Sequence, residues 1–494
     1  MQPTDAVPLR IEPLDSVPAD QSYDCLVLGL AAGDEPAATV AAIDAQQGGW
    51  IARGLSAGTL KSKRGELTLV PSPVPEGPAM VMLVGLGDAD LLDRGKTFEL
   101  GATILRRLVD RQRVRVVIAL DDAIAPENHD ALISGAVTAC AGQSLYQAEP
   151  AVYPPQQLDI VGVSASSVKT GMTIGQSINL TRRLVNEPPN LLYPAAFADA
   201  ARRLAEETGL AVEVWDEKRL AAEGCRAILA VGGASEHPPR LVILRHRGGA
   251  EDDPLVALVG KGVTFDSGGL SIKPSEGMLD MKCDMAGAAT VLGVMRAAAM
   301  LELPINLVGI CGLAENMISG SSYRLGDVIE TRSGTTIEIH NTDAEGRVVL
   351  ADTLDVAVQH QPTAIIDLAT LTGACMVALG RDVAGLMTND SLLCEQIAQA
   401  AVDEGEWAWE LPMFDFYDEQ VKSKVADLKN VGDGRWGGAI TAAKFLQRFV
   451  DGVPWVHIDI AGPAFADSPK PHRDAGGTGV MVRTLIRWLQ GNNE

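Results

Sequence analysis

Residues 254–269 read PLVALVGKGVTFDSGG, an unbroken apolar run that leads into a lysine, an aspartate and two glycines. Such a run is typical of a strand covered on both faces of a sheet. Similar runs recur downstream, separated by helical stretches such as residues 286–300, and predict an α/β/α domain with a mostly parallel central sheet. The runs that we interpret as strands are AVEVWDE (211–217), RAILAVGG (226–233), RLVILRHRG (240–248), INLVGICG (305–312), TAIIDLAT (363–370) and WVHIDIAGP (455–463).

The first third of the chain shows the same alternation on a smaller scale. We expect strands at CLVLGL (25–30), AMVMLVGLG (79–87) and VRVVIAL (114–120), and a helix at residues 100–111. A chain of 494 residues exceeds one compact core, so two domains are expected. Proline and serine interrupt the pattern before a helix that Pro188 and Pro189 end. We therefore predict a smaller N-terminal α/β domain (1–165) and a larger C-terminal α/β/α domain (166–494).

The charge balance argues against nucleic acid as a partner. Lys+Arg number 41 and Asp+Glu 64, a net charge of −23 that repels phosphate backbones. The clearest basic run is RRLVDRQRVR (106–115), which we interpret as a helix with a solvated basic face.

The chain has the features of a cytoplasmic protein. Its seven cysteines are scattered and never spaced as CxxC, which suits reduced thiols. The first twenty residues carry acids and prolines instead of a signal peptide. No uninterrupted apolar stretch reaches the roughly 18 to 20 residues of a membrane span, so we expect no membrane partner.

Two acidic segments follow predicted strands. The first, residues 260–293, holds Lys261, Asp266, Lys273 and Asp284 among glycines, and the second is NTDAEGR (341–347). Ligands bind at the carboxyl ends of strands in open α/β sheets, where we expect Lys261, Asp343 and Thr370 to follow their strands. Four carboxylates gathered in one pocket would repel each other or take up protons, and two divalent cations resolve that repulsion.

Each motif alone has an ordinary structural explanation. DSGG is commonly a turn, and Asp343 with Glu345 could cap a helix N-terminus. The histidines are dispersed without HExxH, and we expect His340 to be a satisfied neighbour of the motif and not a ligand. The GKG glycines lack the spacing of a phosphate-binding loop.

Three blocks resemble the leucyl aminopeptidases, the M17 family of cytosol aminopeptidases. They are VGKGVTFDSGGLSIKP (259–274), MKCDMAGAATVLG (281–293) and NTDAEGRVVLADTL (341–354). The resemblance covers the second domain, including residues 182–190, 367–374, 425–450 and 455–465. Small departures are HRDAGGTG (472–479), where a lysine-containing turn is usual, and Pro463 with Ala464.

The resemblance implies a role for each polar residue. Asp266 and Glu345 would bridge two metals, Asp284 and a neutral Lys261 would complete one site, and Asp343 would complete the other. Lys273 would polarise the scissile carbonyl and stabilise the oxyanion, while Arg347 would hold a bicarbonate that acts as general base for the metal-bridging water. The residues expected to bind substrate are Met281, Asn341, Thr370, Leu371, Gly373 and Ala461.

The implied activity is a two-metal aminopeptidase that releases N-terminal leucine or other apolar residues from peptides and aminoacyl amides. The metals would be Mn²⁺ or Zn²⁺, with Mg²⁺ possible, and the assembly a homohexamer. Three alternatives remain open on the sequence: an additional DNA-binding architectural role, a catalytically silent scaffold, and a two-metal phosphoesterase.

Overall fold

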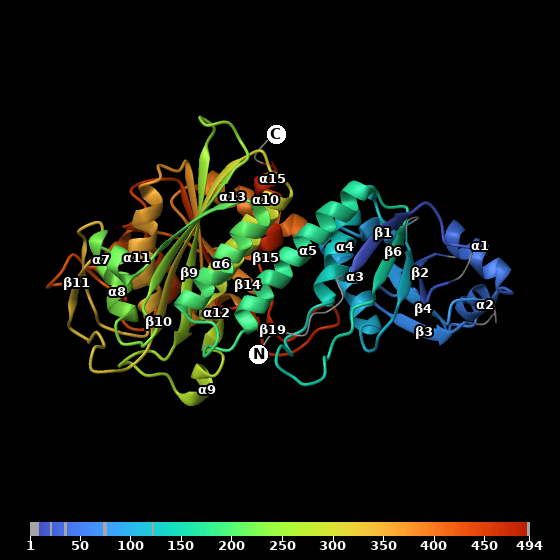
Figure 1. Ribbon diagram of the computed structural model, residues 1–494, viewed down its shortest axis with the longest axis horizontal. Coiled ribbons are helices and arrows are strands. Elements are labelled where there is room, and N and C mark those ends of the chain that lie inside the picture. The colour runs from blue at the N-terminus through green and yellow to red at the C-terminus, as the bar shows by residue number, and fades with distance from the viewer. Residues whose placement is uncertain (1–8, 20–21, 34–36, 73–76, 121–122, 492–494) are drawn as a thin grey trace. The chain divides into compact units, whose positions relative to one another are not determined.

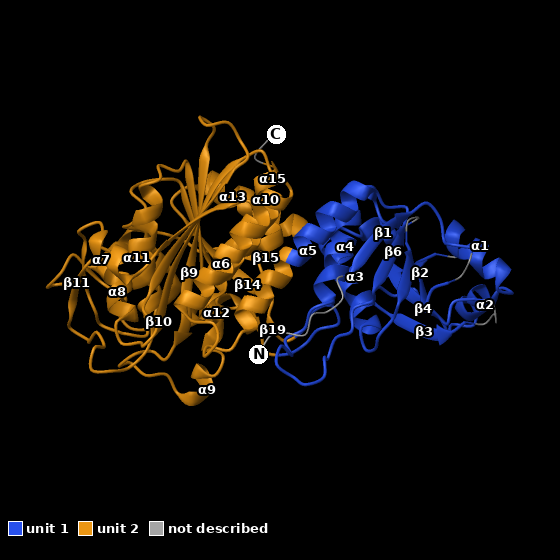
Figure 2. Cartoon of the chain, viewed as in Figure 1, with its two compact units in different colours: residues 1–176, 468–474 blue, residues 177–467, 475–494 orange. Residues whose placement is uncertain are grey.

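The computed structural model describes residues 9–19, 22–33, 37–72, 77–120 and 123–491 (Figure 1). The chain forms two compact units, which comprise residues 1–176 with 468–474 and residues 177–467 with 475–494 (Figure 2). The boundary predicted near residue 166 lies at the start of helix α5 (Ala165–Asn186), and α5 continues into the second unit.

The first unit is built on a six-stranded sheet in the order β1-β6-β5-β2-β4-β3. All neighbouring strands are parallel except β3, which pairs antiparallel with β4. The three strands expected from the sequence are β2, β4 and β5. The bounds are β1 Arg10–Leu14, β2 Cys25–Ala31, β3 Leu67–Pro71, β4 Met80–Gly87, β5 Arg115–Ala119 and β6 Gln157–Val161.

Helices cover both faces of this sheet, which explains why its strands are apolar without alternation. Cys25 and Val27 pack in one hydrophobic core with α3 and α4, whereas Leu26 and Leu28 pack in another with α1 and α2. The bounds are α1 Ala38–Gln46, α2 Trp50–Ser56, α3 Arg94–Leu108 and α4 His129–Ala139, with short 3-10 turns η1 Ala89–Leu91 and η2 Pro126–Asn128.

The second unit contains an eight-stranded sheet in the order β15-β14-β17-β13-β9-β10-β8-β7. Its centre, β17-β13-β9-β10, is parallel, whereas β14 pairs antiparallel with β17, and β8 pairs antiparallel with both β10 and β7. The bounds are β7 Ala211–Trp215, β8 Arg240–Arg247, β9 Leu255–Asp266, β10 Asn306–Asn316, β13 Ala364–Ala369, β14 Val383–Thr388, β15 Trp407–Glu410 and β17 Trp455–Asp459.

Helices lie on both faces of the large sheet, with α6 and α10 on one side and α8 and α11 on the other (Figure 1). This confirms the predicted α/β/α architecture. Residues 275–300 include an 18-residue window that is apolar enough to cross a membrane by length and composition, but 83% of that window is buried within the protein. The segment is therefore a core element.

The remaining elements complete the second unit. The helices are α6 Pro194–Thr208, α7 Glu217–Ala222, α8 Arg226–Gly232, α9 Ser275–Met278, α10 Ala286–Met300, α11 Glu345–Val358, α12 Gly373–Leu379, α13 Ser391–Glu404, α14 Gly438–Gln447 and α15 Val482–Gly491, with 3-10 turns η3 Met281–Met285 and η4 Asp415–Val421. Two small sheets are formed by β11 Val328–Glu330, β12 Thr336–Glu338 and β16 Leu428–Lys429, and by β18 Phe465–Ala466 and β19 Gly476–Gly477.

The strand predicted at residues 226–233 is wrong, because this segment is helix α8. Asp352, fully buried on α11, accepts hydrogen bonds from the backbone N–H groups of Ala227 and Ile228 at 2.8 and 3.0 Å. These are N-terminal N–H groups of α8, which have no partner inside the helix. A distant residue therefore caps the helix, and an apolar run alone does not distinguish a buried helix from a strand.

Only the start of the basic run at residues 106–115 is the solvated helix face that we expected, because Arg106 and Arg107 lie in the last turn of α3 and Arg107 is exposed. Helix α3 ends at Leu108, and two of the arginines beyond it, Arg113 and Arg115, are paired with acids. Arg113 is buried and bonds Asp110 at 2.8 Å, while Arg115 bonds Asp159 at 2.6 Å. The run is therefore partly neutralised within its own unit.

Candidate active site

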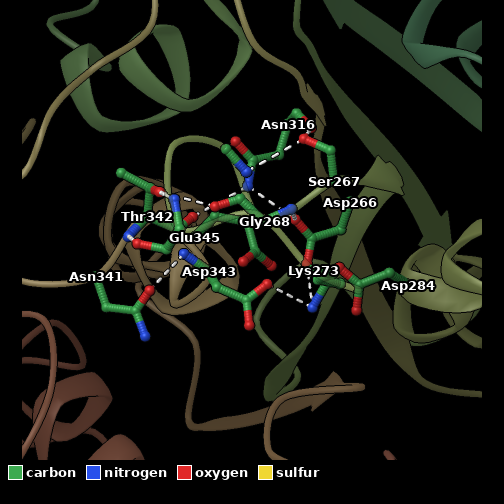
Figure 3. A network of polar contacts seen from close by, with 12 residues as sticks. Asp266, Ser267, Gly268, Lys273, Asp284, Asn316, Asn341, Thr342, Asp343 and Glu345 are labelled. Atoms are coloured by element: carbon green, nitrogen blue, oxygen red, sulfur yellow. Dashed lines mark hydrogen bonds and ion pairs between the residues drawn. The ribbon is translucent and has the colours of Figure 1, made fainter. Parts of the chain in front are cut away.

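The polar segments meet at the carboxyl ends of the central strands of the large sheet (Figure 3). Asp266 is the last residue of β9, Thr370 follows β13, and Glu345 is the first residue of α11. Turn η3 supplies Asp284. Lys261 lies inside β9 and not after a strand, because β9 continues to residue 266.

Lys261 is buried among carboxylates. Its Nζ lies 2.6 Å from Oδ1 of Asp284 and 2.9 Å from Oε1 of Glu345, and it donates to the carbonyl oxygen of Thr370 at 2.9 Å. Burial lowers the pKa of Lys261, but Asp284, Glu345 and Asp266 together raise it above its ordinary value. These carboxylates favour the ammonium form of Lys261, whereas a cation bound beside them would favour the neutral amine that can ligate a metal.

Lys273 contacts the other two carboxylates. Its Nζ lies 2.9 Å from Oδ2 of Asp266 and 2.5 Å from Oδ1 of Asp343. Burial opposes the charge of Lys273, but the adjacent Asp266 and Asp343 raise its pKa. Two lysines therefore interleave with four carboxylates, and every residue predicted to bind metal is in the cluster.

The donor set fits divalent cations. Ligand oxygens of Asp266, Asp343 and Glu345 lie within 4.8 Å of one another. Within the described part of the chain, Oδ2 of Asp284 and Oε2 of Glu345 are buried and have no hydrogen-bond partner. Unpartnered buried carboxylate oxygens are costly unless a cation or proton satisfies them. Oxygen-rich sites with one nitrogen suit Mn²⁺, Mg²⁺ or Zn²⁺.

The pKa values report the same electrostatic repulsion. Burial, and then the charge of Glu345, raise the pKa of Asp266 to about 6 against the attraction of Lys273 and Lys261. Burial also raises the pKa of Asp284 well above its ordinary value, and that of Asp343 to a lesser degree. Cations would stabilise the ionised forms of all these groups.

The DSGG segment is a tight turn, as expected. Gly268 and Gly269 have φ values of +84° and +59°, which residues with a side chain rarely adopt. Gly268 N donates to Oδ1 of Asp266 at 2.9 Å, so the turn also holds the carboxylate.

Sequence reasoning missed Asn316, the last residue of β10. Its side chain is fully buried, and Nδ2 donates to Oδ1 of Asp266 at 2.7 Å and to the carbonyl oxygen of Thr342 at 3.0 Å (Figure 3). The sequence shows only a polar residue at the end of an apolar run, and it does not show that this run lies beside β9, so Asn316 could not be identified from it.

Arg347 lies on the first turn of α11 and is buried. Its Nη1 donates to the carbonyl oxygen of Asn430 at 2.9 Å, and its Nε has no partner among the described residues. Burial lowers its pKa to about 10, against the nearby charges of Glu345 and Asp459. It therefore remains a cation at neutral pH, with a donor free for an anion.

Four of the six residues expected to bind substrate lie near Asp284 or near Asp459. Thr370 belongs to the cluster, since its hydroxyl donates to Oδ1 of Asp284 at 2.8 Å, and Met281 begins the same turn as Asp284. Leu371 N and Ala461 N both donate to Oδ1 of buried Asp459 at 3.1 Å.

Gly373 and Asn341 complete the set of residues expected to bind substrate, and His340 was expected to be a neighbour of the motif and not a ligand. Gly373 begins α12 and is exposed. The Asn341 side chain accepts a bond from Asp343 N at 2.8 Å, so it shapes the loop that carries this acid. His340 pairs with Glu338 at 3.0 Å and is not part of the carboxylate cluster.

Two family models match the chain: the cytosol aminopeptidase family, catalytic domain, over residues 179–486, and the same family's N-terminal domain, over residues 27–149. This chain belongs to the cytosol aminopeptidase family. A probable cytosol aminopeptidase of Rhodopirellula baltica is 65% identical over 435 residues, 88% of this chain and 85% of the relative. One of Syntrophotalea carbinolica is 43% identical over 483 residues, 94% of this chain and 97% of the relative.

Solved structures of the family agree with the fold. A variant of tomato leucine aminopeptidase superimposes with a TM-score of 0.89 at 33% identity, covering 99% of this chain and 98% of that one. The bottromycin maturation enzyme BotP in complex with Mn superimposes with a TM-score of 0.85 at 36% identity, covering 95% and 100%. The chain is thus a metal-dependent aminopeptidase, and the predicted family, fold class and enzyme class are confirmed.

Proposed function

We propose that this aminopeptidase preferentially releases N-terminal leucine and other apolar residues from peptides and aminoacyl amides, at the cluster around Lys261 and Lys273. The observation that carries the assignment of the reaction to this cluster is the pairing of two lysines with four carboxylates at the strand ends. The Nζ atom of each lysine lies within 2.9 Å of two carboxylates. Among the described residues, Oδ2 of Asp284 and Oε2 of Glu345 are buried and have no hydrogen-bond partner.

The chain's residues divide the work of the site. Lys261, Asp266, Asp284, Asp343 and Glu345 would hold two divalent cations, Mn²⁺ or Zn²⁺ with Mg²⁺ possible. Bound there, such cations would activate water and polarise the scissile carbonyl. The side chain of Lys273 is 18% exposed, whereas that of Lys261 is 3% exposed. Lys273 is therefore the lysine that can reach a substrate carbonyl and stabilise the oxyanion.

Arg347 would hold a bicarbonate ion, which would supply the general base. Support comes from its burial, its retained positive charge and its unpartnered Nε. A guanidinium group pairs well with a planar oxyanion and is too basic to accept the proton itself.

The substrate side chain would lie against Met281, Thr370, Leu371, Gly373 and Ala461, with Asn341 shaping the neighbouring loop. The partly buried apolar members of this set favour leucine or methionine over charged residues. Comparing leucinamide with lysinamide and glutamate amide tests this preference, and equal kcat/KM values would contradict it.

The activity itself is tested by removing and restoring metal. A chelator should abolish leucinamide hydrolysis, and added Mn²⁺ or Zn²⁺ should restore it. Lys273→Met should lower kcat by several orders of magnitude with the metals still bound, because the oxyanion loses a preorganised cation. Full activity in chelator, or faster turnover of a phosphate ester than of leucinamide, would overturn the proposal.

Arg347→Ala tests the bicarbonate assignment separately. Wild-type kcat should rise with added bicarbonate in carbon-dioxide-free buffer, and the variant should lose this response. An unchanged bicarbonate response in the variant would exclude Arg347 as the holder.

We also propose a cytoplasmic homohexamer. Several large apolar side chains are exposed, which favours burial between subunits: Trp407, Trp409, Phe414, Phe416 and Trp436. Light scattering near the mass of one chain, 52.1 kDa, would contradict the hexamer. Nothing in the residues that the structure describes favours DNA binding, and a gel shift at low salt should be blank.

A further inference from the structure

We infer that Asn316 is a positioning residue that sets the spacing between the two cation-binding segments of the site. The inference rests on the metal site of the proposed function. One side-chain amide joins Asp266, at the end of β9, to the carbonyl oxygen of Thr342, in the loop that carries Asp343 and Glu345. These segments are otherwise separated by more than seventy residues of chain.

The first bond restricts how Asp266 presents its carboxylate. Oδ1 accepts from Asn316 Nδ2 at 2.7 Å and from Gly268 N at 2.9 Å, whereas Oδ2 faces Lys273 at 2.9 Å. Two donors occupy Oδ1, so Oδ2 is the oxygen left for cations. Hydrogen bonds to the outer oxygen of a metal-binding carboxylate orient it and tune its affinity.

The second bond fixes the loop of the other two acids. The carbonyl oxygen of Thr342 also accepts from the Tyr323 hydroxyl at 2.8 Å. The Thr342 hydroxyl in turn donates to Gly268 O at 2.7 Å and accepts from Ser271 N at 2.8 Å. The loop is therefore tied to the glycine turn after Asp266, and Asn316 lies at the centre of that connection.

Only an amide satisfies both neighbours of this position. Both acceptors, Asp266 Oδ1 and Thr342 O, face Nδ2, and a rotated amide would instead place an oxygen against two oxygens. An aspartate at residue 316 would add a buried charge beside Asp266, and an aliphatic residue would leave both acceptors without this donor. The side chain is fully buried, so water cannot replace the lost bonds easily.

The test measures the Mn²⁺ affinity of the full chain in competition with a metal indicator. Asn316→Ala should weaken Mn²⁺ binding by about 10- to 100-fold, as loss of a partner to a metal ligand typically does. The matched control is Asn306→Ala, at the other end of β10. Asn306 is also buried, and its Nδ2 donates to Ala250 O at 2.6 Å, far from the carboxylates. The control should bind Mn²⁺ within threefold of wild type.

The free energy of unfolding of each variant is measured in chelator. This measurement separates a loss of Mn²⁺ affinity through misplaced ligands from a general loss of stability of the metal-free fold. If Asn316→Ala does not fold, Asn316→Ser, whose shorter hydroxyl cannot span both acceptors, is measured instead with the same expectation. A folded Asn316 variant with wild-type Mn²⁺ affinity, or equal losses of affinity in the Asn316 and Asn306 variants, would overturn the inference. Wild-type leucinamide turnover is measured separately, so a wild type that binds Mn²⁺ but does not hydrolyse refutes the proposed function alone.

Discussion

Replacing Gly346 with alanine should disable the cluster through a single methyl group. Gly346 lies on α11 between Glu345 and Arg347. A Cβ at this position would lie 2.4 Å from Cε and 2.6 Å from Nζ of Lys261, where ordinary contacts begin near 3.4 Å. Lys261 would therefore have to move by about 1 Å, or the helix start would have to shift.

Lys261 cannot make that movement freely, because its Nζ is held by Asp284, Glu345 and Thr370. Overpacking of this kind costs about 1–3 kcal/mol of unfolding free energy. A displacement of about 1 Å at a reacting centre can cost about 100-fold in rate. We therefore expect kcat/KM for leucinamide to fall by about 100-fold, with weaker Mn²⁺ binding.

The assay combines leucinamide kinetics, Mn²⁺ titration and chemical unfolding. Gly277→Ala is the matched control, because Gly277 is also helical and an added Cβ would meet only Pro274 atoms at 3.7 Å or more. The control should keep wild-type kinetics. If Gly346→Ala retains wild-type Mn²⁺ affinity and kcat/KM, the contact with Lys261 does not constrain the site and the reasoning fails.

Two further predictions concern buried acids beneath the site. Asp459→Asn should raise KM for leucinamide by about tenfold with a smaller change in kcat, because Asp459 holds Leu371 N at 3.1 Å and the Thr372 hydroxyl at 2.7 Å; an unchanged KM would contradict this. The pKa of His457 is lowered by burial but raised overall by Asp367, 2.6 Å away, so its contribution to unfolding free energy should be lost as pH rises through that raised pKa. Asp367→Asn should remove the part of this decline in stability that lies above the ordinary histidine pKa of about 6.5, and an unaltered pH profile of stability would refute the assignment.

Much of the fold followed from local sequence patterns. The apolar runs at residues 25–30 and 254–260 became β2 and part of β9, because strands covered on both faces need no alternation. The same rule failed at residues 226–233, where Asp352 caps a buried helix instead. Periodicity carries no information about a cap that lies more than a hundred residues away.

The sequence by itself determined the chemistry available to this protein, and the tertiary structure decided which groups meet. Lys273, Asp343 and Glu345 are recognisable in short motifs, because a run such as NTDAEGR specifies residue types and spacing. Asn316 and Asp459 were not recognisable, because their partners come from other strands and loops. A single asparagine or aspartate has no distinctive pattern. Its contribution arises only when folding buries it against specific donors and acceptors, and water can no longer take their place.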